Sequence, residues 1–399
     1  MHRLWMARRD RALLLLVLAF ALIAQLLFAT IRDDAFITFR YADNIAAGHG
    51  AVFNLGERVE GPADFLWLVL VTLPKALFGL DVATVALVLS TTCVLGCVLL
   101  AYQLGGRFGL LAAVLTAGFS GLAAYGLAGT EMPLFVLLVL AVAHAVKTRH
   151  PMVAGVLAAL AMMTRPEGIA LVGLAGLWLA VRAARRLVSW WAPVGFVLGM
   201  LVFAAPWLVW RSTYYDQAVT TRPVVPFSVA SYGFLLATLA AVGVAVVCEV
   251  RARPSPTPRR GPLAVATVAL AVCALSLPIS AAASHGVSDR RAQLAETTEI
   301  GSWLADHLPP GSVIGTGGSL ALAYAVGSRL VVTDKVRGRP VLIGYATTKD
   351  CTQSGGYLAA TFRRAETGAW VTVYPRDDQF RQLVQLLDDD PRLTYVPCP

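Results

Sequence analysis

The chain has 399 residues, of which 57% are hydrophobic and 14% are charged, and its mean hydropathy is +0.67. Soluble domains are about 45–50% apolar and about 25% charged, so this composition excludes an ordinary soluble protein and predicts an integral membrane protein. The formal net charge of +9 does not indicate a nucleic-acid partner, because most of the excess arginines lie at the ends of apolar segments.

Six apolar runs approach the ~20 residues that cross a bilayer. They lie at 12–31, 82–103, 108–128, 188–210, 228–250 and 262–284. Three shorter runs lie at 132–146, 151–163 and 169–181, which brings the predicted number of transmembrane helices to about nine. The first run is longer than the apolar part of a signal peptide and lacks a small-x-small cleavage site. We therefore interpret it as a retained transmembrane helix.

Basic residues predict the direction of these spans, because lysine and arginine accumulate in short cytoplasmic loops. The clusters fall at alternate junctions, provided that the apolar stretch Phe65 to Leu80 does not cross the membrane. Pro74, Lys75 and Gly79 interrupt that stretch, so we place it at the outer interface. The predicted topology in the plasma membrane has a cytoplasmic N-terminus and an extracytoplasmic C-terminal domain. The clusters are Arg3, Arg8, Arg9 and Arg11; Arg107; Lys147 and Arg149; Arg182, Arg185 and Arg186; and Arg251, Arg253, Arg259 and Arg260.

The first predicted outer loop begins with charged residues, in the stretch IRDDAFITFRYADNIAAGHG at 31–50. A helix that starts at Asp33 places Arg40 nearly two turns further on, on the same face and about 10 Å away. One interpretation is structural, with an aspartate as the N-cap of this helix and Gly48 at its end. The other is chemical, with Asp33 or Asp34 as a base toward a hydroxyl group and the Arg40 guanidinium beside a phosphate.

The residues after His285 are more polar, and helical spacing alternates with short β-rich runs such as SVIGTGG, RLVVTD and AWVTVYP. We therefore divide the chain into a transmembrane domain, 1–285, whose first external loop is 32–81, and a small extracytoplasmic α/β domain, 286–399. The GTGGS stretch is a strand-to-helix turn and not a dinucleotide fingerprint. A bridge between Cys351 and Cys398 is left open. The six histidines show no metal-ligand spacing, so we expect neither a metal nor another cofactor.

Five stretches carry a resemblance to a known family. The segment DDAFITFRYADNIAAGHGAVFNLGERVEG, followed by FLW, resembles the first external loop of actinobacterial GT-C glycosyltransferases, in particular the polyprenyl-phosphate-dependent arabinofuranosyltransferases of the mycobacterial cell wall. GTEMPLF, TRPEG and APWLVWRSTYYD follow in the expected order. The tail stretch from IGSWLADHL to RLVVTD is similar to the soluble part of that family.

The resemblance implies a membrane enzyme that moves a sugar, arabinofuranose or alternatively mannose, from a polyprenyl monophosphate carrier to a cell-envelope glycan without a metal. It implies that Asp33 or Asp34 is the catalytic base and that Arg165 and Glu167 lie at an outward-facing cavity. It assigns Arg40 to shaping the first loop. Two asparagines, Asn44 and Asn54, share that assignment.

Further charged and aromatic residues are candidates for holding the donor. Departure of a phosphate leaving group needs positive charge nearby, and Arg211 and Arg222 are available besides Arg165. Tyr214 belongs to a group of aromatic residues that forms a membrane-interface belt or stacks on a sugar. We interpret Glu131 as an acid that suits a helix N-terminus and leave it out of the site.

Two other classes of function stay open. A lipid transporter would use the same arginines, although the sequence has no internal repeat. A catalytically inactive scaffold subunit is favoured by one departure from the family pattern. The chain reads QAVTTRPVVPF after WRSTYYD, where relatives carry a P-N-T-F-Y-A-K-like run. In this departure Arg222 takes the place of the missing lysine.

Overall fold

The structure is a computed structural model of the chain. It describes residues 8–59, 61, 64–215, 287–307, 310–311, 313–315, 319–333, 341–346, 360–364, 370–375 and 393–395. The chain divides into two compact units. The helical unit comprises Met1–Arg32 and Arg58–Val287, and the α/β unit comprises Asp33–Glu57 and Ser288–Pro399. The predicted spans at 228–250 and 262–284 lie outside the described residues.

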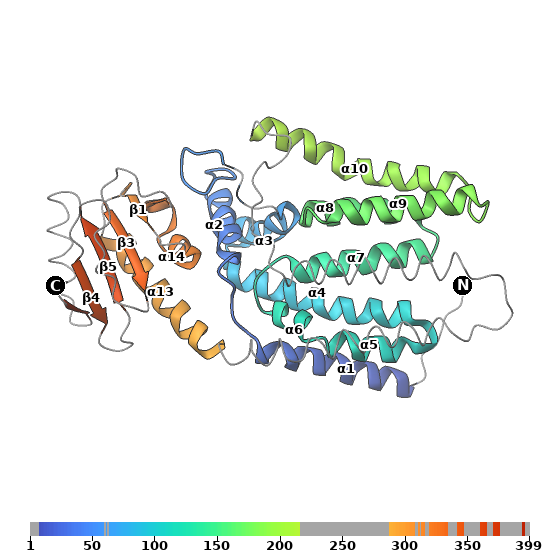
Figure 1. Cartoon of the computed structure of the whole chain (residues 1–399), viewed down its shortest axis with the longest axis horizontal. Helices are drawn as coiled ribbons and strands as arrows, with labels where there is room; N and C mark the ends of the chain where they lie inside the picture. The colour runs from blue at the N-terminus through green and yellow to red at the C-terminus, as the bar shows by residue number, and fades with distance from the viewer. Residues whose placement is uncertain are drawn as a thin grey trace. The chain divides into compact units, whose positions relative to one another are not determined.

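The described part of the helical unit is a series of apolar helices that run side by side (Figure 1). Most of their bounds agree with the apolar runs of the sequence to within a few residues. Of the described helices, α1, α4 and α10 are long and apolar enough to cross a membrane, whereas α3, α7, α8 and α9 are shorter. The helices are α1 (Arg8–Leu27), α3 (Phe65–Phe78), α4 (Val82–Gly105), the 3₁₀ turn η1 (Gly106–Phe108), α5 (Gly109–Ala117), α6 (Ser120–Gly126), α7 (Met132–Lys147), α8 (Pro151–Thr164), α9 (Gly168–Ala184) and α10 (Trp191–Tyr214).

The run at 108–128 differs from the prediction of one continuous span. It forms two helices, α5 and α6, whose axes are bent by 61°. The Gly118 amide donates back to the Val114 carbonyl at 2.8 Å, and Phe119 then takes an extended conformation with ψ 101°. Extended backbone at Phe119 stops the helical hydrogen-bond series, so the chain changes direction inside an apolar run that hydropathy alone reads as uniform.

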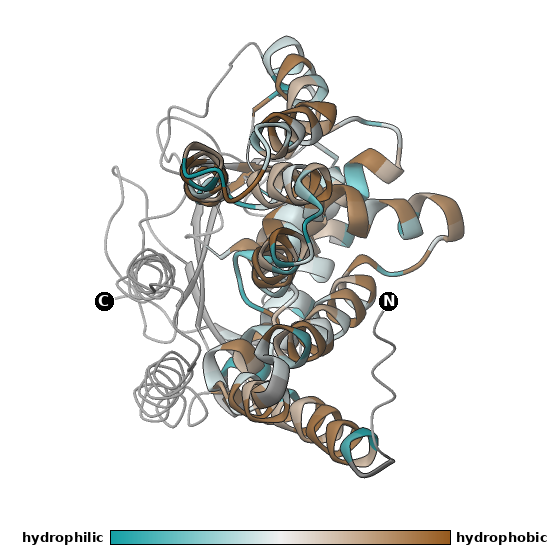
Figure 2. Cartoon of the chain, turned by 90° about the vertical axis from the view of Figure 1, so that its right-hand side faces the viewer, coloured by the Kyte–Doolittle hydropathy of each residue, from teal (hydrophilic) through white to brown (hydrophobic). Residues whose placement is uncertain are grey.

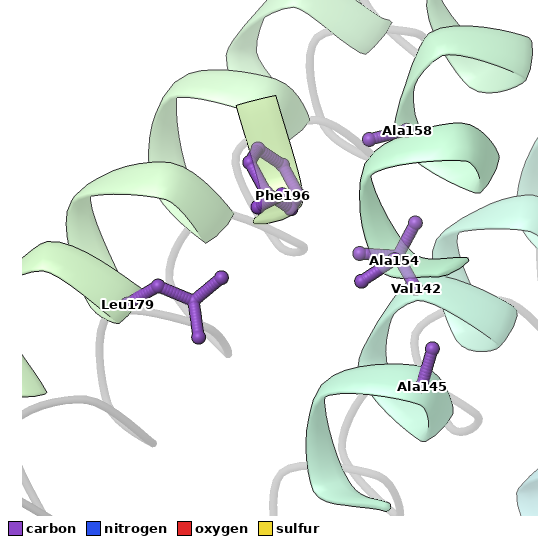
Figure 3. Close-up of a cluster of buried hydrophobic side chains, with 6 residues drawn as sticks. All are labelled: Val142, Ala145, Ala154, Ala158, Leu179 and Phe196. Carbon is purple, nitrogen blue, oxygen red and sulfur yellow. The ribbon is translucent and has the colours of Figure 1, made fainter. Parts of the chain in front are cut away.

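Small residues let α8 and α10 approach closely. A Cβ atom at Gly155 would lie 1.9 Å from the Phe196 carbonyl oxygen, and one at Gly199 would lie 2.1 Å from that of Met152. Small residues at helix contacts are typical of membrane proteins, in which helices associate through close packing. The resulting core cluster contains side chains from α7, α8, α9 and α10 (Figure 3): Val142, Ala145, Ala154, Ala158, Leu179 and Phe196.

The described helices of the helical unit consist largely of hydrophobic residues (Figure 2). Leu15 and Phe20 on α1, Val88 on α4 and Val209 on α10 are each more than half exposed. Soluble proteins rarely expose contiguous apolar surface of this kind, whereas lipid tails are a good solvent for it. The helical unit is therefore a membrane-embedded bundle.

The α/β unit contains a parallel and an antiparallel sheet among its described strands. Strands β1 and β2 pair in parallel, with Ile314 opposite Val332, and the second sheet has the antiparallel order β3-β5-β4-β6. The predicted strands SVIGTGG, RLVVTD and AWVTVYP contain β1, β2 and β5. The elements are α2 (Ala35–Ala46), α13 (Val287–His307), β1 (Val313–Gly315), α14 (Leu320–Ala325), the 3₁₀ turn η2 (Gly327–Arg329), β2 (Val331–Thr333), β3 (Val341–Ala346), β4 (Ala360–Arg364), β5 (Trp370–Pro375) and β6 (Leu393–Tyr395).

Residues 33–57 belong to the α/β unit, whereas the sequence-based division grouped them with the membrane domain. The physical reason is a set of hydrogen bonds across more than 270 residues of chain, together with ring contacts. Phe36 and Phe39 of α2 pack against Tyr324 of α14, with ring centroids 5.4 Å and 5.9 Å apart. Hydropathy does not reveal such a contact, because it depends on which segments meet in space.

Candidate active site

Both candidate catalytic aspartates lie exposed at the start of α2, in the α/β unit. The Asp33 carboxylate accepts hydrogen bonds from the backbone amides of Leu320, at 3.1 Å, and Ala321, at 3.0 Å. These amides open α14, so Asp33 caps that helix and not its own. Asp34 is the N-cap residue of α2 but makes no side-chain capping bond there. The predicted helix therefore forms, but without the predicted capping bond from the side chain of its N-cap residue, and Asp33 is engaged 287 residues away in sequence.

Arg40 is buried, with only 2% of its surface exposed. Its guanidinium donates to the carbonyl oxygens of Phe53, at 2.7 Å, Leu330, at 3.1 Å, and Ala323, and to Asn54 Oδ1 at 3.2 Å. Burial lowers the pKa of Arg40 to about 10. Asp33 precedes α2 and is exposed, whereas Arg40 is buried, so the two side chains do not share one exposed helix face as the seven-residue spacing had suggested. Arg40 therefore holds the loop together and does not present its charge to a donor phosphate, as the sequence had suggested.

The two asparagines of the loop make complementary contacts. The Asn44 amide donates to the Val52 carbonyl at 2.8 Å, which closes the loop on α2. The Asn54 side chain bonds both backbone groups of Val332, donating to its carbonyl at 2.8 Å and accepting from its amide at 3.1 Å. Asn54 thus pairs with β2 in the way a neighbouring strand residue does. The loop-shaping role that the resemblance implied for Asn44 and Asn54 agrees with these contacts.

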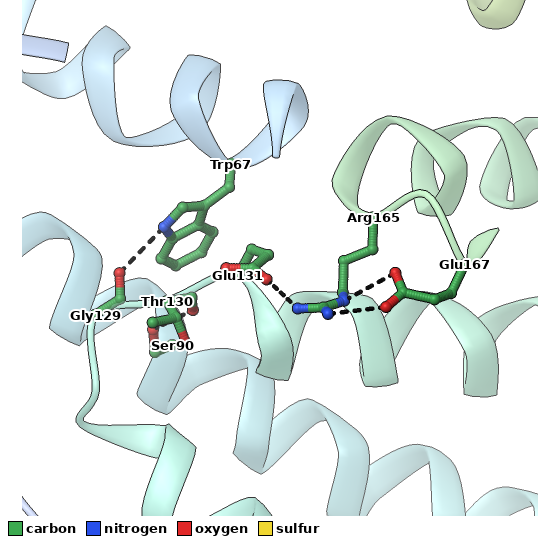
Figure 4. Close-up of polar contacts among 7 residues, drawn as sticks. All are labelled: Trp67, Ser90, Gly129, Thr130, Glu131, Arg165 and Glu167. Atoms are coloured by element: carbon green, nitrogen blue, oxygen red, sulfur yellow. Dashed lines mark hydrogen bonds and ion pairs between the residues drawn. The ribbon is translucent and has the colours of Figure 1, made fainter. Parts of the chain in front are cut away.

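A second charged cluster lies in the helical unit, where Arg165 joins two glutamates (Figure 4). Arg165 follows α8, Glu131 precedes α7 and Glu167 precedes α9. The guanidinium donates to both carboxylate oxygens of Glu167, at 3.2 Å and 3.0 Å, and to Glu131 Oε1. The side chains are 12–21% exposed. Two short connections between helices, α6–α7 and α8–α9, thus bring one cation and two anions together.

The charge balance of this cluster limits what it can bind. With all three groups ionised, one positive and two negative charges give a net charge of −1. Burial by itself lowers the pKa of Arg165, but Coulombic attraction and hydrogen bonds from Glu131 and Glu167 more than offset this effect and raise it above its ordinary value. The two carboxylates outweigh the positive charge of Arg165, which disfavours a phosphate at this cluster. Hydroxyl groups, in contrast, find ready acceptors in the two glutamates.

Buried donors hold the turn from which Glu131 extends (Figure 4). The Trp67 indole Nε1 of α3 donates to the Gly129 carbonyl at 3.2 Å, and the Ser90 hydroxyl of α4 donates to the Thr130 carbonyl at 3.3 Å. Gly129 has φ +77°, which a residue with a side chain rarely adopts. Sequence reasoning left Glu131 out of the site. The GTEMPLF motif indicates Glu131, because Gly129 adopts the positive φ of the turn and Glu131 extends from that turn.

Aromatic rings and arginines gather at the end of α10. The rings of Trp210 and Tyr214 stack at 5.2 Å, and the Phe65 ring lies 4.9 Å from that of Trp210. Arg58 lies over the Tyr214 ring at 5.1 Å, and Arg211 lies over the Trp207 ring at 5.3 Å. Cations over aromatic faces are stabilised by the ring quadrupole.

The predicted candidates Arg211 and Tyr214 therefore share one cluster, and the structure adds Arg58 and Phe65 to it. The sequence signal for Arg58 was weak, since one arginine in a loop has no motif. The remaining candidate, Arg222, and the cysteines Cys351 and Cys398 lie outside the described residues. Within the described ranges, no three His, Cys, Asp or Glu side chains gather as metal ligands. Independence of a metal stays a prediction.

The apolar bundle and the α/β unit define a polytopic α-helical membrane protein. The chain is similar to ArnT from Cupriavidus metallidurans, whose crystal structure was determined bound to undecaprenyl phosphate. The TM-score is 0.50 at 15% sequence identity, and the match covers 92% of this chain and 98% of ArnT. At this identity the likeness shows the fold. No family model and no curated protein sequence matches the chain.

Proposed function

We propose that the protein is an integral membrane glycosyltransferase that moves a sugar from a polyprenyl monophosphate to a cell-envelope glycan on the outer face of the plasma membrane. The observation that carries the proposal is an exposed aspartate pair at the start of α2 in a chain that shares its fold with ArnT, a protein crystallised with undecaprenyl phosphate. Within the helical unit, two charged or aromatic clusters carry groups of the kinds that bind phosphate and sugar hydroxyls.

Asp34 is the base in this proposal. We assign Asp33, whose carboxylate accepts hydrogen bonds from the amides of Leu320 and Ala321, to positioning. Asp34 takes the proton from an acceptor hydroxyl while that oxygen forms a bond to the anomeric carbon of the sugar. The bond between the anomeric carbon and the phosphate oxygen breaks, and the polyprenyl phosphate leaves with the electron pair. The proton ends on Asp34, and no further reactant is needed.

Within the helical unit, we assign binding of the phosphate and of the sugar hydroxyls according to the charge of each cluster. Arg211, with Arg222 and the hydroxyl of Tyr214, supplies positive charge and hydrogen bonds for the phosphate, because an arginine fork suits phosphate oxygens. The Arg165 cluster has a net charge of −1 and accepts sugar hydroxyls through Glu131 and Glu167. In this proposal Arg165 does not bind the phosphate, as the sequence had suggested, but holds Glu131 and Glu167 in place.

The donor is tested by transfer of labelled sugar. Membranes that contain the protein are supplied separately with decaprenylphosphoryl arabinose and with polyprenylphosphoryl mannose, and label in envelope glycan acceptors is counted. The resemblance in the first loop predicts transfer from the arabinose donor. Transfer from the mannose donor alone would keep the enzyme and change the sugar. Transfer from neither donor by correctly inserted protein would contradict the proposal and favour an inactive scaffold subunit.

A further inference from the structure

Side chains of the first loop form hydrogen bonds with backbone atoms of a distant stretch of the chain, Ser319–Thr333. Asp33 accepts from the amides that open α14. Arg40 donates to the carbonyls of Ala323 and Leu330, and Asn54 bonds both backbone groups of Val332. These hydrogen bonds from the loop side chains therefore depend on the backbone conformation of α14, η2 and β2. Such contacts form only when that shape is already built.

The buried guanidinium of Arg40 requires the acceptors that Ser319–Thr333 supplies. Among the residues that the structure describes, no carboxylate forms an ion pair with Arg40, and its charge is met by carbonyl and amide oxygens. A buried charge without its acceptors is strongly unfavourable. If Ser319–Thr333 moved away, Arg40 would lose the Ala323 and Leu330 carbonyls together. The loop and this stretch therefore keep or lose their arrangement as one.

We propose that Ser319–Thr333 is a positioning element for the catalytic loop: it fixes α2, and hence Asp34, through Arg40 and Asn54, and transfer stops when the two segments separate. The positioning role rests on the proposed function, whereas the docking of the two segments does not. Arg40 and Asn54 are positioning residues, because each acts on Asp34 only through α2.

Docking is tested without any activity assay. A protease site is inserted between His285 and Gly286 of the full-length chain, the protein is cut in membranes, and the membranes are washed and sedimented. The fragment that carries Ser319–Thr333 is expected to stay with the membranes through the loop at 33–57. Arg40→Met and the milder Asn54→Asp, which loses the donor to the Val332 carbonyl, are expected to release about tenfold more fragment, since each removes buried hydrogen bonds.

Arg329→Met is the matched control, because Arg329 lies in the same stretch but its side chain is exposed. Release of the fragment that is equal for all these variants and the unsubstituted chain would overturn the docking. A global folding defect is recognised by release from the Arg40→Met variant together with aggregation of the uncut protein. In that case Asn54→Asp decides the outcome.

Positioning is then tested by kinetics on uncut protein, with the donor found active above. Asn54→Asp is expected to lower the turnover rate at least tenfold while the donor KM stays within about twofold, since the donor contacts lie on other residues. Among the cut proteins, activity is expected to fall in step with the amount of fragment released. Full activity after removal of the fragment would overturn the positioning role. Absence of transfer from any donor, with docking intact, would overturn the proposed function and leave the docking supported.

Discussion

At the scale of single residues, Arg165 is a cation that joins the carboxylates of Glu131 and Glu167. Its planar guanidinium reaches two oxygens of Glu167 and one of Glu131, a geometry that the single ammonium of a lysine does not reproduce. The residue type, and not only its charge, is therefore required. A substitution that preserves the charge separates the two requirements.

Arg165→Lys is predicted to lower the rate of sugar transfer at least tenfold, because Glu131 and Glu167 lose their common anchor and repel each other. The measurement is the transfer rate in membranes with equal amounts of inserted protein. Arg185→Lys is the matched control, since Arg185 is exposed at the end of α9. A variant with the activity of the unsubstituted protein would show that bidentate contact is dispensable.

At the scale of secondary-structure elements, helix ends are fixed by groups from neighbouring helices. The turn before α7 is held by Trp67 from α3 and Ser90 from α4, and both side chains are fully buried. Their partners are backbone carbonyls, so the turn keeps its shape independently of its own side chains. The direction of Glu131 follows from that shape.

Trp67→Phe is predicted to reduce transfer while the protein stays folded. The change keeps an aromatic ring but removes the donor to the Gly129 carbonyl, and a buried carbonyl left unpaired costs about 1–3 kcal/mol. Transfer rate and thermal unfolding in detergent are measured together. Trp191→Phe, at a side chain that is 78% exposed, controls for the substitution itself. Equal rates for both variants would exclude a role for this hydrogen bond.

Packing between α8 and α10 gives a prediction about stability. Gly155→Val places a Cβ where the Phe196 carbonyl lies, so the helices must move apart, and the free energy of unfolding is predicted to fall by at least about 1–3 kcal/mol. Gly173→Val is the matched control, because a Cβ there meets nothing within 4 Å. Thermal unfolding in detergent distinguishes the two. A Gly155→Val midpoint equal to that of the control would contradict the close contact.

At the scale of the whole molecule, hydropathy predicted the elements of the helical unit, because membrane helices are defined by length and apolar content. Hydropathy did not predict the break at Gly118 and Phe119, because the segments before and after it, α5 and α6, are both apolar. The resemblance singled out the first loop and Arg165 with Glu167. The burial of Arg40 and the contact of Asp33 with α14 were not predictable, because both depend on atoms more than 280 residues away in sequence.

The central claim is that the Asp34 carboxylate carries out general-base chemistry on a polyprenyl-linked sugar. The most direct measurement is the turnover rate of Asp34→Asn in membranes, with the active donor and matched amounts of protein. Asp81→Asn is the control, because Asp81 caps α4 by accepting from the Thr84 amide at 2.8 Å and asparagine is an equally good N-cap. We predict that Asp34→Asn lowers turnover by about 10²–10⁴-fold while Asp81→Asn does not. Turnover of Asp34→Asn within twofold of the unsubstituted protein would contradict the claim.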